Sequence, residues 1–240
     1  MMNMMREHVP SECRIHYIIS NGGQAPNVVP ERASVLYYIR HPKAEVVLEV
    51  LERAKDAARG AALGTGTDVT FEVVNGNYER LTNRHLSSIM LSSLKSVGGV
   101  VLDEREKAFC SEIMRNSGWD ADLSNFEIVE PEIYEGFSGA SSDVGNVSQM
   151  GPLVQMSVAT QVMNAGLHSW QQTSIGGTTV GTKSLMVVAG AEYLAALHLY
   201  THPEDVKAML DEYYAARGRD FKFVPLMGDR RPPLDYCKGK

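Results

Sequence analysis

The hydrophobic positions near the start of the chain follow the pattern of β-strands. Two runs, Arg14–Ser20 and Ala33–Arg40, are rich in β-branched and aromatic residues. The loop between them contains Gly, Pro and Asn residues, which favour a rigid turn, and Asn27 lies in that turn. The pattern therefore predicts a β-hairpin whose loop presents one amide side chain in a defined direction.

The apolar spacing then changes to that of a helix. A helix is expected from Pro42 to about Arg59, where glycines follow, and the alternation in Asp68–Val74 predicts another strand. With a helical start before the hairpin, the order is helix, strand, strand, helix, strand. This order predicts a βαββαβ unit that lacks its first strand, over residues 1–80.

In the second part of the chain, residues 81–240, the sequence pattern predicts mainly helices. Asp103 and Glu106 have the spacing of a capping box at the start of one of them. The helix Lys183–Leu199 is apolar nearly all round, so we expect it in a core. The predicted elements are helices at Asn83–Ser96, Glu104–Asn116, Lys183–Leu199 and from Pro203 to Gly218, a turn-rich loop at Ser141–Ser148 and a strand at Leu153–Ala159.

Composition and charge argue against a nucleic-acid-binding, a disulfide-rich and a membrane protein. The net charge of −6 gives no basic surface for nucleic acid, and 44% apolar residues suffice for a sizeable core. Three widely spaced cysteines, Cys13, Cys110 and Cys237, fit reduced thiols better than a disulfide framework. No stretch of about 18 uncharged residues is apolar enough for a convincing membrane span, and the start of the chain lacks the apolar run of a signal peptide. These features predict a cytoplasmic protein.

Two residues of the hairpin could bind a carboxylate. Arg40 closes the second strand thirteen residues after Asn27. A guanidinium binds a carboxylate in a bidentate fork, so an Asn and an Arg that converge across the hairpin would form a clamp. The alternative is a surface strand pair with a solvated arginine.

Four segments, in this order, carry a resemblance to a known family: GGQAPNVVPERA…YYIR, SGASSDVGNVSQMGP, NAGLHSWQ and GTTVGTKSL. The set resembles the zinc-dependent peptidase and amidohydrolase family of carboxypeptidase G and aminoacylase, and is most similar to its aminobenzoyl-glutamate utilisation branch. The resemblance covers almost the whole chain. It implies an α/β fold, with a partial ferredoxin-like α+β lid (dimerisation) domain followed by the C-terminal part of an α/β zinc-peptidase-like catalytic domain.

The resemblance also implies site residues. His168 would be a metal ligand, and Asn27 and Arg40 would bind a substrate carboxylate. Ser142 and Asp143 would line the substrate site, where hydroxyls could stabilise an oxyanion. On composition alone, His168 would be a structural or surface residue, and Asp143 could instead form an Asx turn.

The family's remaining zinc-site residues are missing from the sequence. No His-x-Asp and no Glu-Glu pair occurs in the 240 residues, although the family uses these for two zinc ions and the general base. The resemblance therefore implies the C-terminal half of a metal-dependent amidohydrolase, inactive alone, for an acyl- or aminobenzoyl-glutamate-like substrate. As partners it implies a homodimer through the lid or a complex with the missing N-terminal half. The alternative function is a non-catalytic dimerisation or carboxylate-binding remnant.

Overall fold

The computed structural model describes residues 1–126, 140–231 and 234. They separate into two units, which we describe in turn. The first unit contains residues 1–80, 140–146 and the described residues from 222 onward, and the second contains the described residues of 81–221 outside 140–146.

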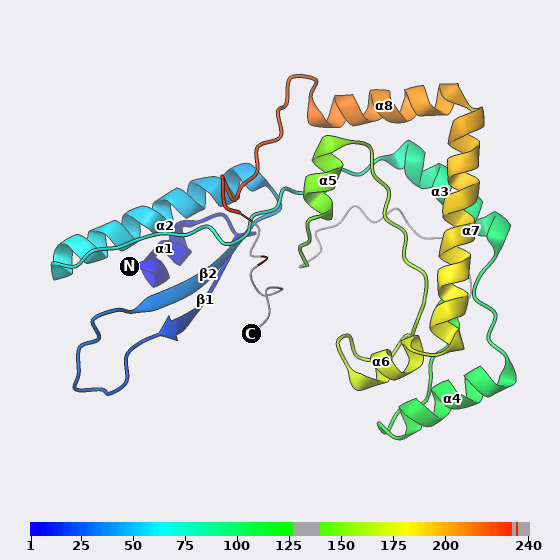
Figure 1. Ribbon diagram of the computed structural model, residues 1–240, viewed down its shortest axis with the longest axis horizontal. Coiled ribbons are helices and arrows are strands. Elements are labelled where there is room, and N and C mark those ends of the chain that lie inside the picture. The colour runs from blue at the N-terminus through cyan, green and yellow to red at the C-terminus, as the bar shows by residue number, and fades with distance from the viewer. Residues whose placement is uncertain (127–139, 232–233, 235–240) are drawn as a thin grey trace. The chain divides into compact units, whose positions relative to one another are not determined.

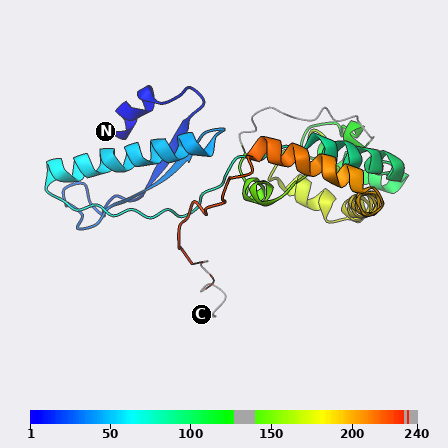
Figure 2. The same cartoon turned by 90° about the horizontal axis from the view of Figure 1, so that it is seen from above.

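The first unit contains the predicted hairpin. Strands β1 (Arg14–Asn21) and β2 (Ser34–Arg40) pair antiparallel, with Arg14 opposite Arg40 and Asn21 opposite Ser34. Helix α2 (Ala44–Thr65) packs on one face of the hairpin, and the short helix α1 (Met2–Met5) lies against α2 (Figures 1 and 2). The 3₁₀ turn η1 (Arg6–His8) follows α1. Cys13, Ile15 and Val50 form the small core of this unit.

Helix α2 is longer than the sequence predicted. It continues through Gly60 and Gly64 and ends at Gly66, whose φ is +67°. A glycine inside a helix costs about 1 kcal/mol relative to alanine, which is too little to end a long helix. Of Gly60, Gly64 and Gly66, only Gly66 has a positive φ, and its left-handed conformation ends the helix.

The two further predicted strands are wrong. Asp68–Val74 and Leu153–Ala159 have no regular structure, and the described residues contain one two-stranded sheet. Apolar and polar residues do alternate in these segments, but a strand also needs a neighbouring strand for its backbone hydrogen bonds. The carbonyl of Val74 instead accepts from Arg230 Nη1, and that of Ala159 accepts from Ser184 Oγ. The βαββαβ unit is therefore not formed, although the mixture of helices with a small sheet is compatible with an α/β protein.

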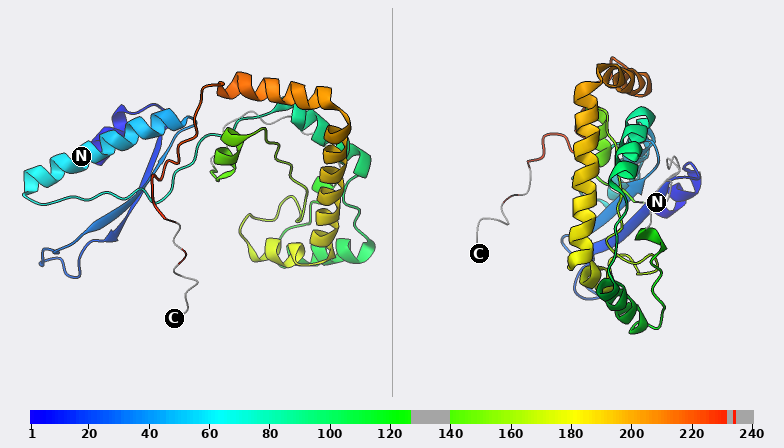
Figure 3. Two further views of the ribbon diagram at one scale, coloured as in Figure 1. Left: turned by 45° about the horizontal axis from the view of Figure 1, so that its top comes forward. Right: turned by 90° about the vertical axis from the view of Figure 1, so that its right-hand side faces the viewer.

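The second unit is helical, and most of its helices were predicted. Helix α3 lies against α7 (Figure 3), and α8 follows α7 directly. The capping box of α4 is confirmed, because Asp103 Oδ1 accepts from Glu106 N at 2.9 Å and Glu106 Oε2 accepts from Asp103 N at 2.8 Å. The bounds are α3 (Arg84–Val97), α4 (Glu104–Arg115), η2 (Ser124–Phe126), α5 (Val144–Met150, which starts in the first unit), α6 (Trp170–Gly176), α7 (Thr179–Thr201) and α8 (Pro203–Arg217).

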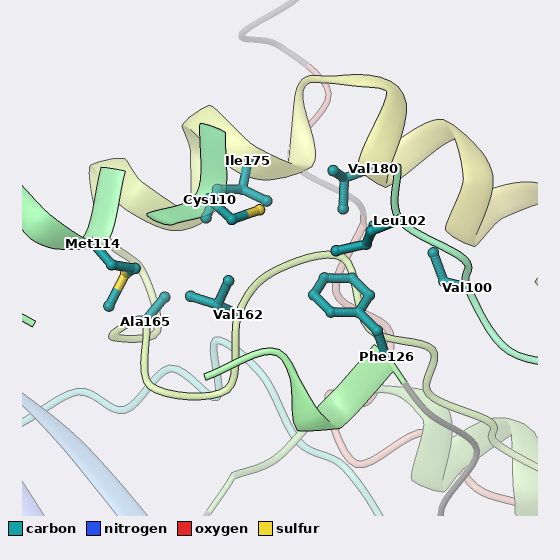
Figure 4. Close-up of a cluster of buried hydrophobic side chains, with 9 residues drawn as sticks. All are labelled: Val100, Leu102, Cys110, Met114, Phe126, Val162, Ala165, Ile175 and Val180. Atoms are coloured by element: carbon teal, nitrogen blue, oxygen red, sulfur yellow. The ribbon is translucent and has the colours of Figure 1, made fainter. Parts of the chain in front are cut away.

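Two short helices were not predicted. The expected turn-rich loop at Ser141–Ser148 contains α5, and the segment after His168 forms α6. Each has only seven residues, so neither shows a clear apolar period in the sequence. The core of this unit gathers around α4, α6 and the start of α7 (Figure 4). It consists of Val100, Leu102, Cys110, Met114, Phe126, Val162, Ala165, Ile175 and Val180.

Helix α7 is only half buried in this chain, contrary to the prediction that it belongs in a core. One face is buried at Val180, Ser184, Ala191 and Ala195. The opposite face exposes large apolar side chains: Leu185, Met186, Tyr193, Leu197 and Tyr200. By length and composition alone α7 could cross a membrane, but core helices of globular proteins pass the same test.

Candidate functional site

The hairpin register separates the two residues that were expected to form a carboxylate clamp. Arg40 pairs with Arg14, whereas Asn27 lies in the loop beyond the Asn21–Ser34 pair. The six residue steps from Ser34 to Arg40 correspond to roughly 20 Å of strand. The expected convergence of Asn27 and Arg40 across the hairpin is therefore wrong, because each occupies a different end of it. Their roles in substrate binding stay predictions.

Arg40 lies in an environment that suits recognition of a planar anion. It is half-buried at the end of β2, and its guanidinium lies 5.5 Å from the ring centroid of Tyr38. Stacking on an aromatic face restrains the plane of a guanidinium, the group that binds a carboxylate in a bidentate fork.

The loop that carries Ser142 and Asp143 is fixed by its neighbours Gly145 and Asn146. Asn146 Oδ1 accepts from Tyr78 N at 2.8 Å, and Asn146 Nδ2 donates to Asn77 Oδ1 at 3.1 Å. A Cβ atom at Gly145 would lie 1.9 Å from the carbonyl oxygen of Tyr78. The sequence reasoning missed both residues, because the contacting segment is almost 70 positions away.

Ser142 and Asp143 are exposed and immediately precede α5. Their side chains make no hydrogen bond with other described residues, so the Asx turn offered as the alternative for Asp143 finds no support there. The two side chains are therefore available to a ligand from the first unit.

His168 has an unusual backbone. Its φ is +59°, and it is the one non-glycine residue of the described chain with positive φ. Its imidazole is exposed and makes no hydrogen bond or ion pair with described residues. Its backbone N–H donates to Gln172 Oε1 at 2.8 Å. Backbone strain of this kind concentrates at functional sites, so the conformation supports a functional role for His168.

The described residues do not form a zinc site by themselves. They contain no group of three or more His, Cys, Asp or Glu side chains that could hold a metal ion. A catalytic zinc has three protein ligands, and of the predicted residues only His168 has an imidazole. His168 belongs to the second unit, whereas Asn27, Arg40, Ser142 and Asp143 belong to the first.

Two charged clusters of the second unit were not predicted. Glu106 is buried and accepts from Lys183 Nζ and Thr179 Oγ1, both at 2.6 Å. These bonds lower the pKa of Glu106 to about 2. Asp205 accepts from His198 Nε2 at 2.7 Å and from His85 Nε2 at 2.9 Å, and the bond from His198 contributes most to lowering its pKa. Each cluster connects side chains of different helices, so we expect both to stabilise the packing of these helices.

The sequence of the chain is similar to those of known hydrolases. The chain is 29% identical over 224 residues to a p-aminobenzoyl-glutamate hydrolase subunit of Escherichia coli (strain K12), and the match covers 82% of this chain and 47% of that protein. It is also 27% identical over 213 residues to the Xaa-Arg dipeptidase of Mus musculus, covering 88% of this chain and 43% of that protein. The Xaa-Arg dipeptidase of Homo sapiens is 26% identical over 151 residues, covering 62% of this chain and 33% of that protein.

The chain is a relative of these hydrolases. The resemblance predicted from the ordered motifs is thereby confirmed, including its aminobenzoyl-glutamate branch. No family model matches the chain. The chain spans about half the length, or less, of these relatives.

Proposed function

We propose that this chain is the C-terminal half of a metal-dependent amidohydrolase that cleaves the amide bond of an acyl- or aminobenzoyl-glutamate-like substrate. The observation that carries the proposal is the similarity to the p-aminobenzoyl-glutamate hydrolase of E. coli over 82% of the chain. The exposed, strained His168 supports it, because a family ligand is expected at that motif. The dipeptidase relatives also support hydrolysis of an amide bond.

The proposal assigns substrate recognition to the first unit. Arg40 would bind a carboxylate such as the α-carboxylate of a glutamate moiety, since its guanidinium is planar and is held beside Tyr38. Asn27 would contact the substrate from the hairpin loop, separately from Arg40 in the same copy. Ser142 and Asp143 would bind or orient it from the loop that Gly145 and Asn146 fix in place.

The proposal places the remaining metal ligands outside this chain. His168 is the one predicted ligand, and no three possible ligands lie together among the described residues, so they fall short of the three ligands of a catalytic zinc. We therefore propose that the chain alone is inactive. It would work as a homodimer through the hairpin unit or with the missing N-terminal half, and in the cytoplasm, where the buried thiols of Cys13 and Cys110 would stay reduced.

The exposed stripe of α7 supports association with another segment. The side chains Leu185, Met186, Tyr193, Leu197 and Tyr200 lie at helical spacing on one face, and contiguous apolar surface of this kind marks an interface. The relatives are about twice as long as the matched region, so they contain the chain length that could cover such a face. Light scattering of the isolated chain should show dimers or larger species. A monodisperse monomer that binds no hydrophobic dye would argue against this assignment.

The central experiment measures hydrolysis and zinc binding by the purified 240-residue chain. We expect no hydrolysis of p-aminobenzoyl-glutamate or of an Xaa-Arg dipeptide, and weak zinc binding by calorimetry. Addition or fusion of the N-terminal half of the E. coli relative should restore chelator-sensitive hydrolysis, and His168→Ala should abolish it.

Two outcomes would contradict parts of the proposal. Chelator-sensitive hydrolysis by the chain alone would show that it is not an incomplete half. Failure of every complementing segment, together with specific binding of glutamate, would favour the carboxylate-binding remnant instead.

A further inference from the structure

The backbone at His168 is held in a conformation that costs free energy. An L-residue in the left-handed region is uncommon, because its Cβ approaches the backbone too closely. His168 adopts φ +59° directly before Ser169, which caps the N-terminus of α6. Such strain persists only where neighbouring interactions over-determine the conformation. A neighbouring residue is therefore expected to hold His168 in this conformation.

The hydrogen bonds around the start of α6 identify Gln172. Ser169 Oγ accepts from Gln172 N at 3.3 Å and donates to the carbonyl oxygen of Gly166 at 2.6 Å. In an ordinary capping box, the side chain three positions after the cap accepts from the N–H of the cap residue itself. Here Gln172 Oε1 accepts at 2.8 Å from the N–H of His168, one position earlier. The bond therefore constrains the strained residue and not the cap.

The adjacent glutamine shows that this contact is specific. Gln171 Nε2 donates to Ser117 Oγ at 2.7 Å, away from the strained backbone. The imidazole of His168 itself has no hydrogen-bond partner among the described residues, so the local bonds fix the backbone and leave the ring accessible.

We infer that Gln172 is a positioning residue that holds the imidazole of His168 in the direction required by the hydrolase reaction. The inference rests on the proposed function for the use of His168, but the geometry of the Gln172 contact stands independently of it. Gln172 does not touch substrate in this assignment. It acts through the backbone of His168.

The test uses the full chain with ¹³C-labelled histidine and reads the ring signals by NMR. Gln172→Leu removes the acceptor, and Gln172→Asn is too short to reach. Both should shift or broaden the His168 signals while the other histidine signals stay unchanged. Gln172→Glu keeps an acceptor at the same position and should restore the original signals. Gln171→Leu is the matched control and should leave them unchanged.

A second arm measures the strain itself. His168→Gly should unfold at a higher temperature than His168→Ala, because glycine adopts positive φ without a steric cost. In an active reconstituted hydrolase, Gln172→Leu should lower kcat about tenfold or more with little change in KM, since a small misplacement of a reacting group has such an effect.

Unchanged His168 signals in Gln172→Leu, or equal effects of Gln171→Leu and Gln172→Leu, would overturn the inference. Equal melting temperatures of the glycine and alanine variants at position 168 would also count against it. If the NMR result holds but no reconstituted enzyme is active, the proposed function fails and the positioning contact does not.

Discussion

Replacement of Glu106 by glutamine tests the principal electrostatic contact of the second unit. The carboxylate of Glu106 is 7% exposed on α4 and accepts from Lys183 Nζ, Thr179 Oγ1 and Asp103 N. Glu106→Gln keeps the size of the side chain but removes its negative charge. The amine of Lys183 then loses its close ionic partner at 2.6 Å and keeps only the carboxylate of Asp103 at 4.0 Å, which is costly beside a buried group.

The magnitude follows from the pKa. The three donors, with Lys183 first, lower the pKa of Glu106 from 4.5 to about 2. That difference corresponds to at most about 3 kcal/mol of folding stability. Lys183 is 39% exposed, so solvent screening reduces the expected contribution to about 2 kcal/mol. Because the folded-state pKa is the lower one, the contribution is complete above pH 4.5 and disappears as the pH falls towards 2.

Urea unfolding followed by tryptophan fluorescence measures how much Glu106 contributes to the stability of the second structural unit. Both tryptophans of the chain, Trp119 and Trp170, lie in the second unit. At pH 7, Glu106→Gln should lower the free energy of unfolding by about 2 kcal/mol, and the difference from wild type should shrink at about pH 3.

The matched control is Glu104→Gln on the same helix. Glu104 pairs with Lys107 at 2.8 Å, but its side chain is 88% exposed, so its replacement should change stability little at either pH. An equal loss in both variants, or a loss in Glu106→Gln that does not depend on pH, would refute the assignment of the low pKa to this buried contact.

Three further predictions address the other contacts. Gly145→Ala should lower the melting temperature by several degrees and expose the 140–146 loop to limited proteolysis, because a Cβ atom would lie 1.9 Å from the Tyr78 oxygen; Gly151→Ala, with open space around it, is the control. Asp205→Asn should lower the melting temperature, measured by circular dichroism, because the negative charge is lost and one of the two oxygens that accept from His85 and His198 becomes an NH2 group, which cannot accept. Arg40→Lys should reduce kcat/KM of a complete enzyme with an unchanged fold, because lysine lacks the bidentate fork, and wild-type kinetics would exclude the role.

Local signals in the sequence predicted much of the fold. The hairpin, α3, α4, α7 and α8 were predicted because their periodicity and caps are encoded within a few residues, as in the Asp103–Glu106 capping box. The ordered motifs also identified the relatives. The sequence further indicated His168 as a candidate, although it could not reveal its positive φ.

Other features were decided by partners far away in the sequence. The N-terminus of α2 is capped by Glu79, whose Oε2 accepts from Ala44 N at 3.0 Å, and the N–H groups of Arg84 and His85 at the start of α3 donate to Glu212. No local pattern predicts such a contact, because it depends on which segments the fold brings together.

The sequence by itself therefore determined the main helices and the hairpin, the family resemblance and the types of residue available for chemistry. Only the tertiary structure decided that two alternating segments are not strands, that Asn27 and Arg40 occupy opposite ends of the hairpin, and that Gly145 must lack a side chain. The physical reason is that strand pairing, strand register and close packing are interactions between distant segments. Helix propensity and capping act within about one turn of the chain, so the sequence shows them directly.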